Sequence, residues 1–330
     1  MQRIITKEEL SSTLKELLKE YEVIAPKDLS NKGIFYQEIS DVADLCLGGG
    51  FAIEPIKKFF LEPCSRICKH SQDDGAGAQA IEQPQKKRII IGARPCEARG
   101  LELLDKIFDG ELKDSFYINN RARTLIVGLA CNEPDGCCFC TSMSGSPVET
   151  RGMDALLFDF ADTYVVAVIT EKAKNIFGSF GKELDAQTKR SWEKDNEKRI
   201  NSLQKKISPP KSMDDIFQSD YWKEASQSCL SCGICTFLCP TCHCFDLIDE
   251  ERKMFRCYDG CAFPDFTLEA SGGNPRPGKK ERYRQRVYHK FDYFKKNFGE
   301  NLCVGCGRCI RHCPVKIDIA EIVANAPISG

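Results

Sequence analysis

The chain has 330 residues, 42% of them hydrophobic and 29% charged, so it is long enough for about two packed domains and is not wholly disordered. Its 47 basic and 48 acidic residues nearly cancel, which disfavours a globally basic nucleic-acid binder and an acidic tail protein. Its 20 cysteines are unusually many. In a long chain with no secretion signal, such usage favours metal ligation over disulfide bonds.

The start of the chain and its apolar runs predict the cellular location of the protein. Residues 1–10 contain no basic segment followed by an apolar one, so we expect no signal peptide. The longest apolar runs, such as residues 164–169, have the length of a strand and fall far short of the roughly 18 residues that span a membrane. We therefore expect a cytoplasmic protein with no membrane span, whose reduced thiols are free to bind metal.

A helix is the first predicted element. Leucines at helical spacing indicate an amphipathic helix over residues 7–20. Thr6 is followed three residues later by Glu9, which is typical of a capping box at a helix start.

Strands and helices then alternate along the chain. β-rich runs predict strands at residues 88–94, 124–129 and 163–170. A helix is expected directly after Pro95, and turn-rich segments predict loops at residues 48–50 and 71–85. The alternation is typical of an α/β layer domain over about residues 1–180.

A polar, lysine-rich segment follows this domain. Residues 171–210 predict a solvated helix that runs into a Pro-Pro break. We place the domain boundary at the end of this linker. Beyond Trp222 the sequence is dominated by cysteine motifs and has few strand signals.

Two cysteine runs form an internal repeat. Each has the pattern C-x2-C-x2-C-x3-C-P, at residues 229–240 and 303–314. This is the bacterial ferredoxin pattern for [4Fe–4S] clusters, in which short gaps let one loop place three thiolates around a cluster. A single C-x2-C would also suit zinc, but two complete copies predict two [4Fe–4S] clusters.

In two-cluster ferredoxins the fourth cysteine of each run binds the cluster of the other run. The first cluster is therefore expected to use Cys229, Cys232, Cys235 and Cys313. The second is expected to use Cys303, Cys306, Cys309 and Cys239.

These patterns define the expected architecture. Residues 1–210 form an α/β (or α+β) domain with a polar linker at its end, and residues 211–330 form a ferredoxin-like di-[4Fe–4S] domain. A long insertion, residues 240–302, separates the two cluster motifs.

The insertion holds four further cysteines beside His243, namely Cys242, Cys244, Cys257 and Cys261. They are compatible with an additional site for zinc or a further cluster. They are also compatible with buried thiols that surround the predicted clusters, and this is the interpretation that we favour.

The insertion ends in a basic stretch, residues 276–290, with Tyr283 and Tyr288 between the basic side chains. Such a pattern raises the possibility of nucleic-acid binding. We expect instead a local electrostatic role, because four thiolates outweigh the charge of a [4Fe–4S] core and leave net negative charge nearby. No nucleic acid is expected as a partner.

The amino-terminal domain contains a less regular set of cysteines. Cys96 and Cys131 each follow a predicted strand, and Cys137, Cys138 and Cys140 come soon afterwards. Cysteines at the ends of separate strands converge on one edge of a sheet, where a cluster fits.

The chain resembles the family of iron–sulfur electron-transfer proteins that includes the A subunit of anaerobic sulfite reductase and the β subunit of sulfhydrogenase. The matching motifs span nearly the whole chain. They are Ala25-Pro26, residues 36–39, 92–96, Cys131-x6-Cys138-Phe-Cys140, 239–244, 259–261, 284–286, 289–290 and 303–309.

The resemblance implies a subunit with three [4Fe–4S] clusters that joins a flavin-containing, ferredoxin-reductase-like subunit to a catalytic redox subunit. The third cluster would use Cys96, Cys131, Cys138 and Cys140, which leaves Cys137 as an extra thiol. Cys46, Cys64, Cys68 and Cys257 lie outside the pattern.

The sequence lacks catalytic machinery of its own. It has four histidines and no nucleophile–base motif, and it has neither G-x-G-x-x-G after a strand nor G-x4-G-K-[ST]. We therefore expect no flavin or nicotinamide on this chain, and a partner must supply that chemistry. Two alternatives are a self-sufficient iron–sulfur reductase that uses a metal site at residues 242–261, and a redox-sensing iron–sulfur scaffold.

Overall fold

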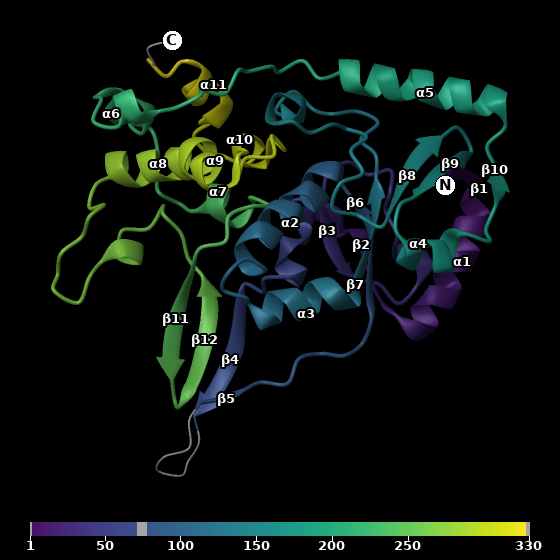
Figure 1. Cartoon of the computed structure of the whole chain (residues 1–330), viewed down its shortest axis with the longest axis horizontal. Helices are drawn as coiled ribbons and strands as arrows, with labels where there is room; N and C mark the ends of the chain where they lie inside the picture. The colour runs from purple at the N-terminus through teal and green to yellow at the C-terminus, as the bar shows by residue number, and fades with distance from the viewer. Residues whose placement is uncertain (1, 71–77, 328–330) are drawn as a thin grey trace. The chain divides into compact units, whose positions relative to one another are not determined.

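The computed structural model describes residues 2–70 and 78–327, whose helices and strands are drawn in Figure 1. The chain divides into two units. Unit 1 comprises Met1–Ile56, Gln85–Lys206 and Val304–Cys306, and unit 2 comprises Lys57–Pro84, Ile207–Cys303 and Gly307–Gly330. The boundary at residue 210 stays a prediction. The units differ from it because Lys57–Pro84 packs with the carboxy-terminal part and three residues of the second cysteine run pack with the amino-terminal part.

Unit 1 is built on an eight-stranded mixed sheet. The strands, in their order across the sheet, are β10 (Lys182–Glu183), β1 (Gln2–Thr6), β9 (Thr163–Val168), β8 (Ala155–Phe160), β7 (Thr124–Leu129), β6 (Arg88–Ala93), β2 (Glu22–Asp28) and β3 (Ile34–Glu38). The central strands β2, β6, β7 and β8 are parallel, and the outer pairs are antiparallel. The α/β architecture predicted for this part of the chain is confirmed.

The described residues of unit 1 add five helices to this sheet: α1 (Lys7–Glu20), α2 (Pro95–Phe108), α3 (Ser115–Arg123), α4 (Glu171–Phe177) and α5 (Ala186–Asn201). Helices α1 and α4 share one hydrophobic core with the sheet, to which Ile89, Val127 and Leu157 contribute. The alternate residues Ile90, Ile126 and Leu156 are also fully buried, so the central strands are covered on both faces.

The predicted start of α1 is confirmed. Thr6 Oγ1 accepts a hydrogen bond from the Glu9 backbone N–H at 3.0 Å, and Glu9 Oε2 accepts one from the Thr6 N–H at 2.8 Å. The two side chains therefore satisfy two backbone donors that have no partner within the helix. Leu10, Leu14 and Leu17 face the core, as their helical spacing predicts.

The polar helix predicted within residues 171–210 is present as α5, but it occupies only part of that segment. Helix α4 ends before Gly178, the short strand β10 pairs with β1, and α5 begins after Asp185. Gly181 explains the break, because its φ of +67° is strained for other residues and a Cβ there would lie 2.2 Å from the carbonyl oxygen of Ile4.

Unit 2 contains, in its described residues, an antiparallel four-stranded sheet and six short helices. The strands, in their order across the sheet, are β11 (Phe245–Glu250), β12 (Lys253–Tyr258), β4 (Cys64–His70) and β5 (Ala78–Ala80). The helices are α6 (Tyr221–Ala225), α7 (Ile234–Phe237), α8 (Lys279–Tyr288), α9 (Phe294–Phe298), α10 (Arg308–Arg311) and α11 (Ile319–Ala324), and a π-helical turn (His289–Tyr293) joins α8 to α9. The hairpin of β11 and β12 lies beside β4 (Figure 1).

No local strand signal was strong enough to predict this hairpin. The loop predicted at residues 71–85 contains β5, and residues 71–77 lie outside the described part of the chain. No helix within residues 2–70 and 78–327 has the length and apolar character that crossing a membrane requires.

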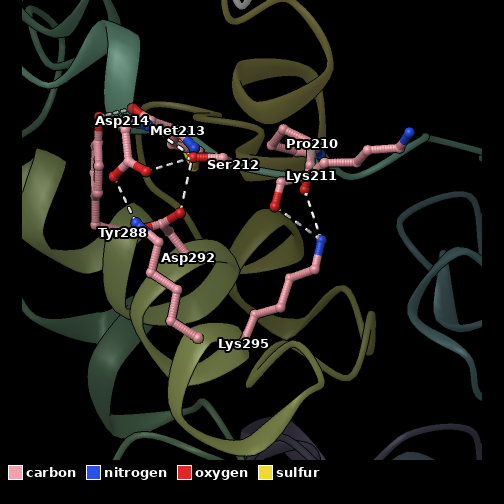
Figure 2. Close-up of polar contacts among 9 residues, drawn as sticks. Pro210, Lys211, Ser212, Met213, Asp214, Tyr288, Asp292 and Lys295 are labelled. Carbon is pink, nitrogen blue, oxygen red and sulfur yellow. Dashed lines mark hydrogen bonds and ion pairs between the residues drawn. The ribbon is translucent and has the colours of Figure 1, made fainter.

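The chain that follows the linker is tied to α8, the π-turn and α9 (Figure 2). Lys295 Nζ donates to the carbonyl oxygens of Pro210 and Lys211 at 3.0 and 3.2 Å. The Tyr288 hydroxyl donates to the Met213 carbonyl at 2.6 Å, and the buried Asp292 carboxylate accepts from the Met213 N–H at 3.2 Å. These bonds hold α8 and the π-turn in place, and both elements carry buried basic side chains that lie near cysteines.

Candidate metal centres

One pocket of unit 1 is lined by four predicted cluster ligands. Cys96 lies in the first turn of α2, Cys131 follows β7, and Cys138 and Cys140 lie in the loop after it. The pocket encloses about 290 Å³, part of it open to solvent, and apolar side chains including Phe51 and Pro147 complete its wall. Four cysteines that line one pocket supply soft sulfur donors of the kind that iron–sulfur clusters use, so the residue types fit such a cluster. Cys137 does not line the pocket.

Arg94 holds the segments that carry these cysteines. Its guanidinium donates to the carbonyl oxygens of Ala130, directly before Cys131, at 3.1 Å and of Gly50 at 2.9 Å. The same guanidinium lies over the ring of Phe51, another pocket residue. The motif at residues 92–96 therefore contains a positioning residue, Arg94, as well as the predicted ligand Cys96.

Glu97 is fully buried and fixes the start of α2. Its carboxylate accepts hydrogen bonds from the Arg94 N–H at 2.7 Å, the Tyr36 hydroxyl at 2.6 Å and the Ile56 N–H at 3.3 Å. Tyr36 belongs to the motif at residues 36–39, so two separated motifs meet at this carboxylate.

Replacing Glu97 with glutamine is expected to destabilise unit 1 by about 1–3 kcal/mol, because an amide N–H₂ would face buried donors. Native-state hydrogen exchange at the amides of β6 would measure the loss. Glu111→Gln, at an exposed position, is the matched control and should change exchange little. Equal protection in Glu97→Gln and the unaltered protein would contradict the role assigned to this carboxylate.

A segment of the second cysteine run reaches the same pocket. Gly305 and Cys306 line it, and the Phe139 N–H donates to the Gly305 carbonyl at 2.9 Å. A Cβ on Gly305, whose φ is +66°, would lie 2.6 Å from the Phe139 carbonyl group, so only glycine allows this approach. The sequence analysis missed this contact, because no local signal links residues 304–306 to residues 138–140.

The carboxy-terminal pocket lies in unit 2 and is lined by all four ligands predicted for the first cluster, Cys229, Cys232, Cys235 and Cys313. It encloses about 530 Å³, partly open to solvent, and Cys309 also lines it. The Ser231 N–H donates to Cys229 Sγ at 3.4 Å and the Ile317 N–H to Cys313 Sγ at 3.3 Å. Backbone N–H groups directed at sulfur, with this donor set, fit a bound iron–sulfur cluster.

The two cysteine runs share one local backbone. Ser231 and Gly305 hold equivalent positions with φ of 54° and 66°, and Gly233 and Gly307 hold the next equivalent positions with φ of 76° and 70°. Each of these last two glycines caps a four-residue helix, α7 or α10, and these helices contact each other. The repeat seen in the sequence is therefore a repeat in conformation.

The ligands predicted for the second cluster are divided between the units. Cys239, Cys303 and Cys309 belong to unit 2, and Cys306 belongs to unit 1. Burial by itself lowers the pKa of the nearby Lys290 ammonium, but the sulfurs of Cys239 and Cys242 outweigh burial and raise that pKa. The residues around Cys239 therefore favour negative charge on sulfur.

The four cysteines of the insertion do not form one site. Cys257 on β12 lies opposite Cys64 on β4, and the two sulfurs form a disulfide. A disulfide sulfur does not act as a thiolate ligand, so the expectation of a four-cysteine site at Cys242, Cys244, Cys257 and Cys261 needs correction. Within the described residues, no three Cys, His, Asp or Glu side chains converge as the ligands of a single metal ion would. The register of two strands far apart in sequence decided the pairing.

The basic stretch at residues 276–290 forms α8 and the start of the π-turn, and much of it faces inward. Arg282, Arg286 and Lys290 are buried, as are Tyr283 and Tyr288. Arg286 Nη1 donates to Cys242 Sγ at 3.2 Å. These basic side chains therefore lie in the interior of unit 2, where Arg286 contacts a cysteine.

A family model described as a 4Fe-4S dicluster domain matches residues 228–317, a range that contains both cysteine runs. The chain is also 32% identical over 304 residues to sulfhydrogenase 2 subunit beta of Pyrococcus furiosus, and the alignment covers 87% of each chain. The chain belongs to the sulfhydrogenase β subunit family. No solved structure matches it.

Membership in the sulfhydrogenase β subunit family confirms the resemblance seen in the motifs. The protein is an iron–sulfur protein of mixed α/β architecture, with a 4Fe-4S dicluster domain in its carboxy-terminal part. The family match extends beyond that domain, since the aligned region is far longer than residues 228–317.

Proposed function

We propose that the protein is the electron-transfer subunit of a multi-subunit cytoplasmic oxidoreductase. In this proposal it relays single electrons through three [4Fe–4S] clusters between a catalytic redox subunit and a flavin-containing, ferredoxin-reductase-like subunit. The observation that carries the proposal is that two separate pockets are each lined by one complete predicted set of four cysteines.

Three sets of residues would hold the clusters. They are Cys229, Cys232, Cys235 and Cys313 for the first, Cys303, Cys306, Cys309 and Cys239 for the second, and Cys96, Cys131, Cys138 and Cys140 for the third. Each cluster, when bound, supplies transfer of one electron at a time. The protein's part is to hold the thiolates, exclude water and supply hydrogen bonds and charge to sulfur.

The second set contains one residue that lines each pocket. Cys306 lines the pocket in unit 1, and Cys309 lines the pocket in unit 2. Only two residues separate Cys306 from Cys309 in the chain.

The proposed partners follow from what the chain lacks and from its relative. Its sequence has no nucleotide-binding motif and no nucleophile–base motif, so exchange with a two-electron donor requires a flavin on a different chain. The relative is named as a subunit of a sulfhydrogenase, which supports assembly with a catalytic subunit of that or a related redox class. No nucleic acid is part of the proposal.

Native mass spectrometry of the complex, purified anaerobically from its source, tests this function. We expect a heteromer that contains a flavin subunit, with the mass of this chain raised by three four-iron clusters. A chain that purifies alone, loaded with iron and able to reduce a disulfide or oxyanion, would contradict the proposal. A partner with neither flavin nor catalytic metal would also contradict it.

A further inference from the structure

Three basic side chains are buried together in unit 2. Lys57, Arg286 and Lys290 expose only 2%, 5% and 2% of their surface. Within the described part of the chain, none of the three forms an ion pair with a carboxylate. We name these three side chains the cation cluster.

The cation cluster surrounds the segment that contains Cys239. Lys57 Nζ donates to the carbonyl oxygens of Cys242 at 2.7 Å and Thr236 at 3.3 Å. Lys290 Nζ donates to Thr241 Oγ1 at 2.7 Å, and that hydroxyl lies 3.4 Å from Cys239 Sγ. All of these contacts lie within unit 2.

Arg286 completes the group. It donates to the Cys235 carbonyl at 2.8 Å and to Cys242 Sγ at 3.2 Å. It also lines the pocket around Cys229, whereas Lys57 and Lys290 do not. Of the three cations, Arg286 alone lines the pocket of the first cluster, while Lys57 and Lys290 contact the segment around Cys239.

Burying a cation without a counter-ion is costly, and neighbouring buried cations also repel one another. The arrangement is stable only if negative charge lies among the three side chains. A [4Fe–4S] cluster with four thiolates carries net negative charge, and accepting one electron makes that charge more negative. Fixed positive charge nearby therefore favours the reduced form over the oxidised form.

We propose that the cation cluster raises the reduction potential of the iron–sulfur cluster that Cys239 binds. This inference rests on the ligand assignment in the proposed function. The effect is largest on this cluster, since Lys57 and Lys290 contact the segment of Cys239 and do not line the pocket of the first cluster. The reduced state of the Cys239-bound cluster is then stabilised relative to its neighbours.

Redox titration followed by electron paramagnetic resonance tests the proposal on the full-length chain, purified anaerobically and reduced with dithionite. The signal of interest is the one that Cys239→Ser changes. In Lys290→Met its midpoint should shift to more negative potential while the other signals keep theirs. Lys290→Arg retains the charge and should restore the midpoint. Lys223→Met removes the charge of an exposed lysine and should shift nothing.

An unchanged midpoint in Lys290→Met, or an equal shift in Lys223→Met, would overturn the inference. If Lys290→Met fails to retain the cluster and Lys290→Arg retains it, the requirement for positive charge is supported. If both variants lose the cluster, Lys290 has a packing role and Lys57→Met carries the test: a midpoint shifted to more negative potential supports the inference, and an unchanged midpoint overturns it. The titration needs no partner protein, so it stays decisive even if the proposed complex is not found.

Discussion

The Cys140→Ser variant is expected to lose one whole cluster, which is about a third of the chain's iron, and to keep the other two. Cys140 lines the pocket of unit 1 together with Cys96, Cys131 and Cys138. Burial raises the pKa of its thiol to about 12, so a thiolate at this position would need bound metal to stabilise it. A serine hydroxyl is a far weaker ligand for iron than a thiolate.

Iron and acid-labile sulfide analysis, with spin quantitation of the reduced protein, measures this loss. Cys137→Ser is the matched control, because Cys137 is adjacent to Cys138 and does not line the pocket. It should retain all of its iron. If Cys140→Ser keeps its iron and Cys137→Ser loses it, Cys137 and not Cys140 is a ligand of the third cluster.

The Cys313→Ser variant is expected to alter the same spectroscopic signal as Cys229→Ser, with loss of about a third of the iron. Cys313 belongs to the second run in sequence, but it lines the pocket of the first run with Cys229, Cys232 and Cys235. The Ile317 N–H donates to its sulfur within the same unit. Removing this thiolate should therefore leave the signal that depends on Cys303 unchanged.

Electron paramagnetic resonance of the reduced variants shows whether Cys313 binds the first cluster, with Cys229, or the cluster of its own run, with Cys303. Cys261→Ser serves as the control, since Cys261 is a half-buried thiol of the insertion that lines neither pocket, and its spectrum should match that of the unaltered protein. A Cys313→Ser spectrum that matches Cys303→Ser instead would show that each run binds only its own cluster.

Local sequence signals predicted the elements whose cause is local. The helix at residues 7–20 and its capping box follow from leucine spacing and from two side chains three residues apart, and the structure confirms both. The strands predicted at 88–94, 124–129 and 163–170 are likewise present, because long β-rich runs bounded by turns suit buried strands. The polar helix predicted within residues 171–210 fills only part of the segment, because Gly181 adopts a positive φ where the chain approaches β1, and local sequence does not show that approach.

For the cysteine ligands too, local sequence determined part of the prediction. The spacing of the two cysteine runs by itself determined that the carboxy-terminal part is an iron–sulfur domain, because the geometry of a cluster requires that spacing over only a few residues. The resemblance to the family extended the prediction of a cluster to the amino-terminal cysteines, and that ligand set stays a prediction.

Only the tertiary structure decided what long-range packing controls. It paired Cys64 with Cys257 through strand register, brought Val304–Cys306 to the loop of Cys138 and Cys140, and buried Lys290 beside Thr241. The partners in each case are separated by 49 to 193 residues in the chain. Contacts at such separation depend on how whole strands and helices pack, and no local pattern of residue types encodes them.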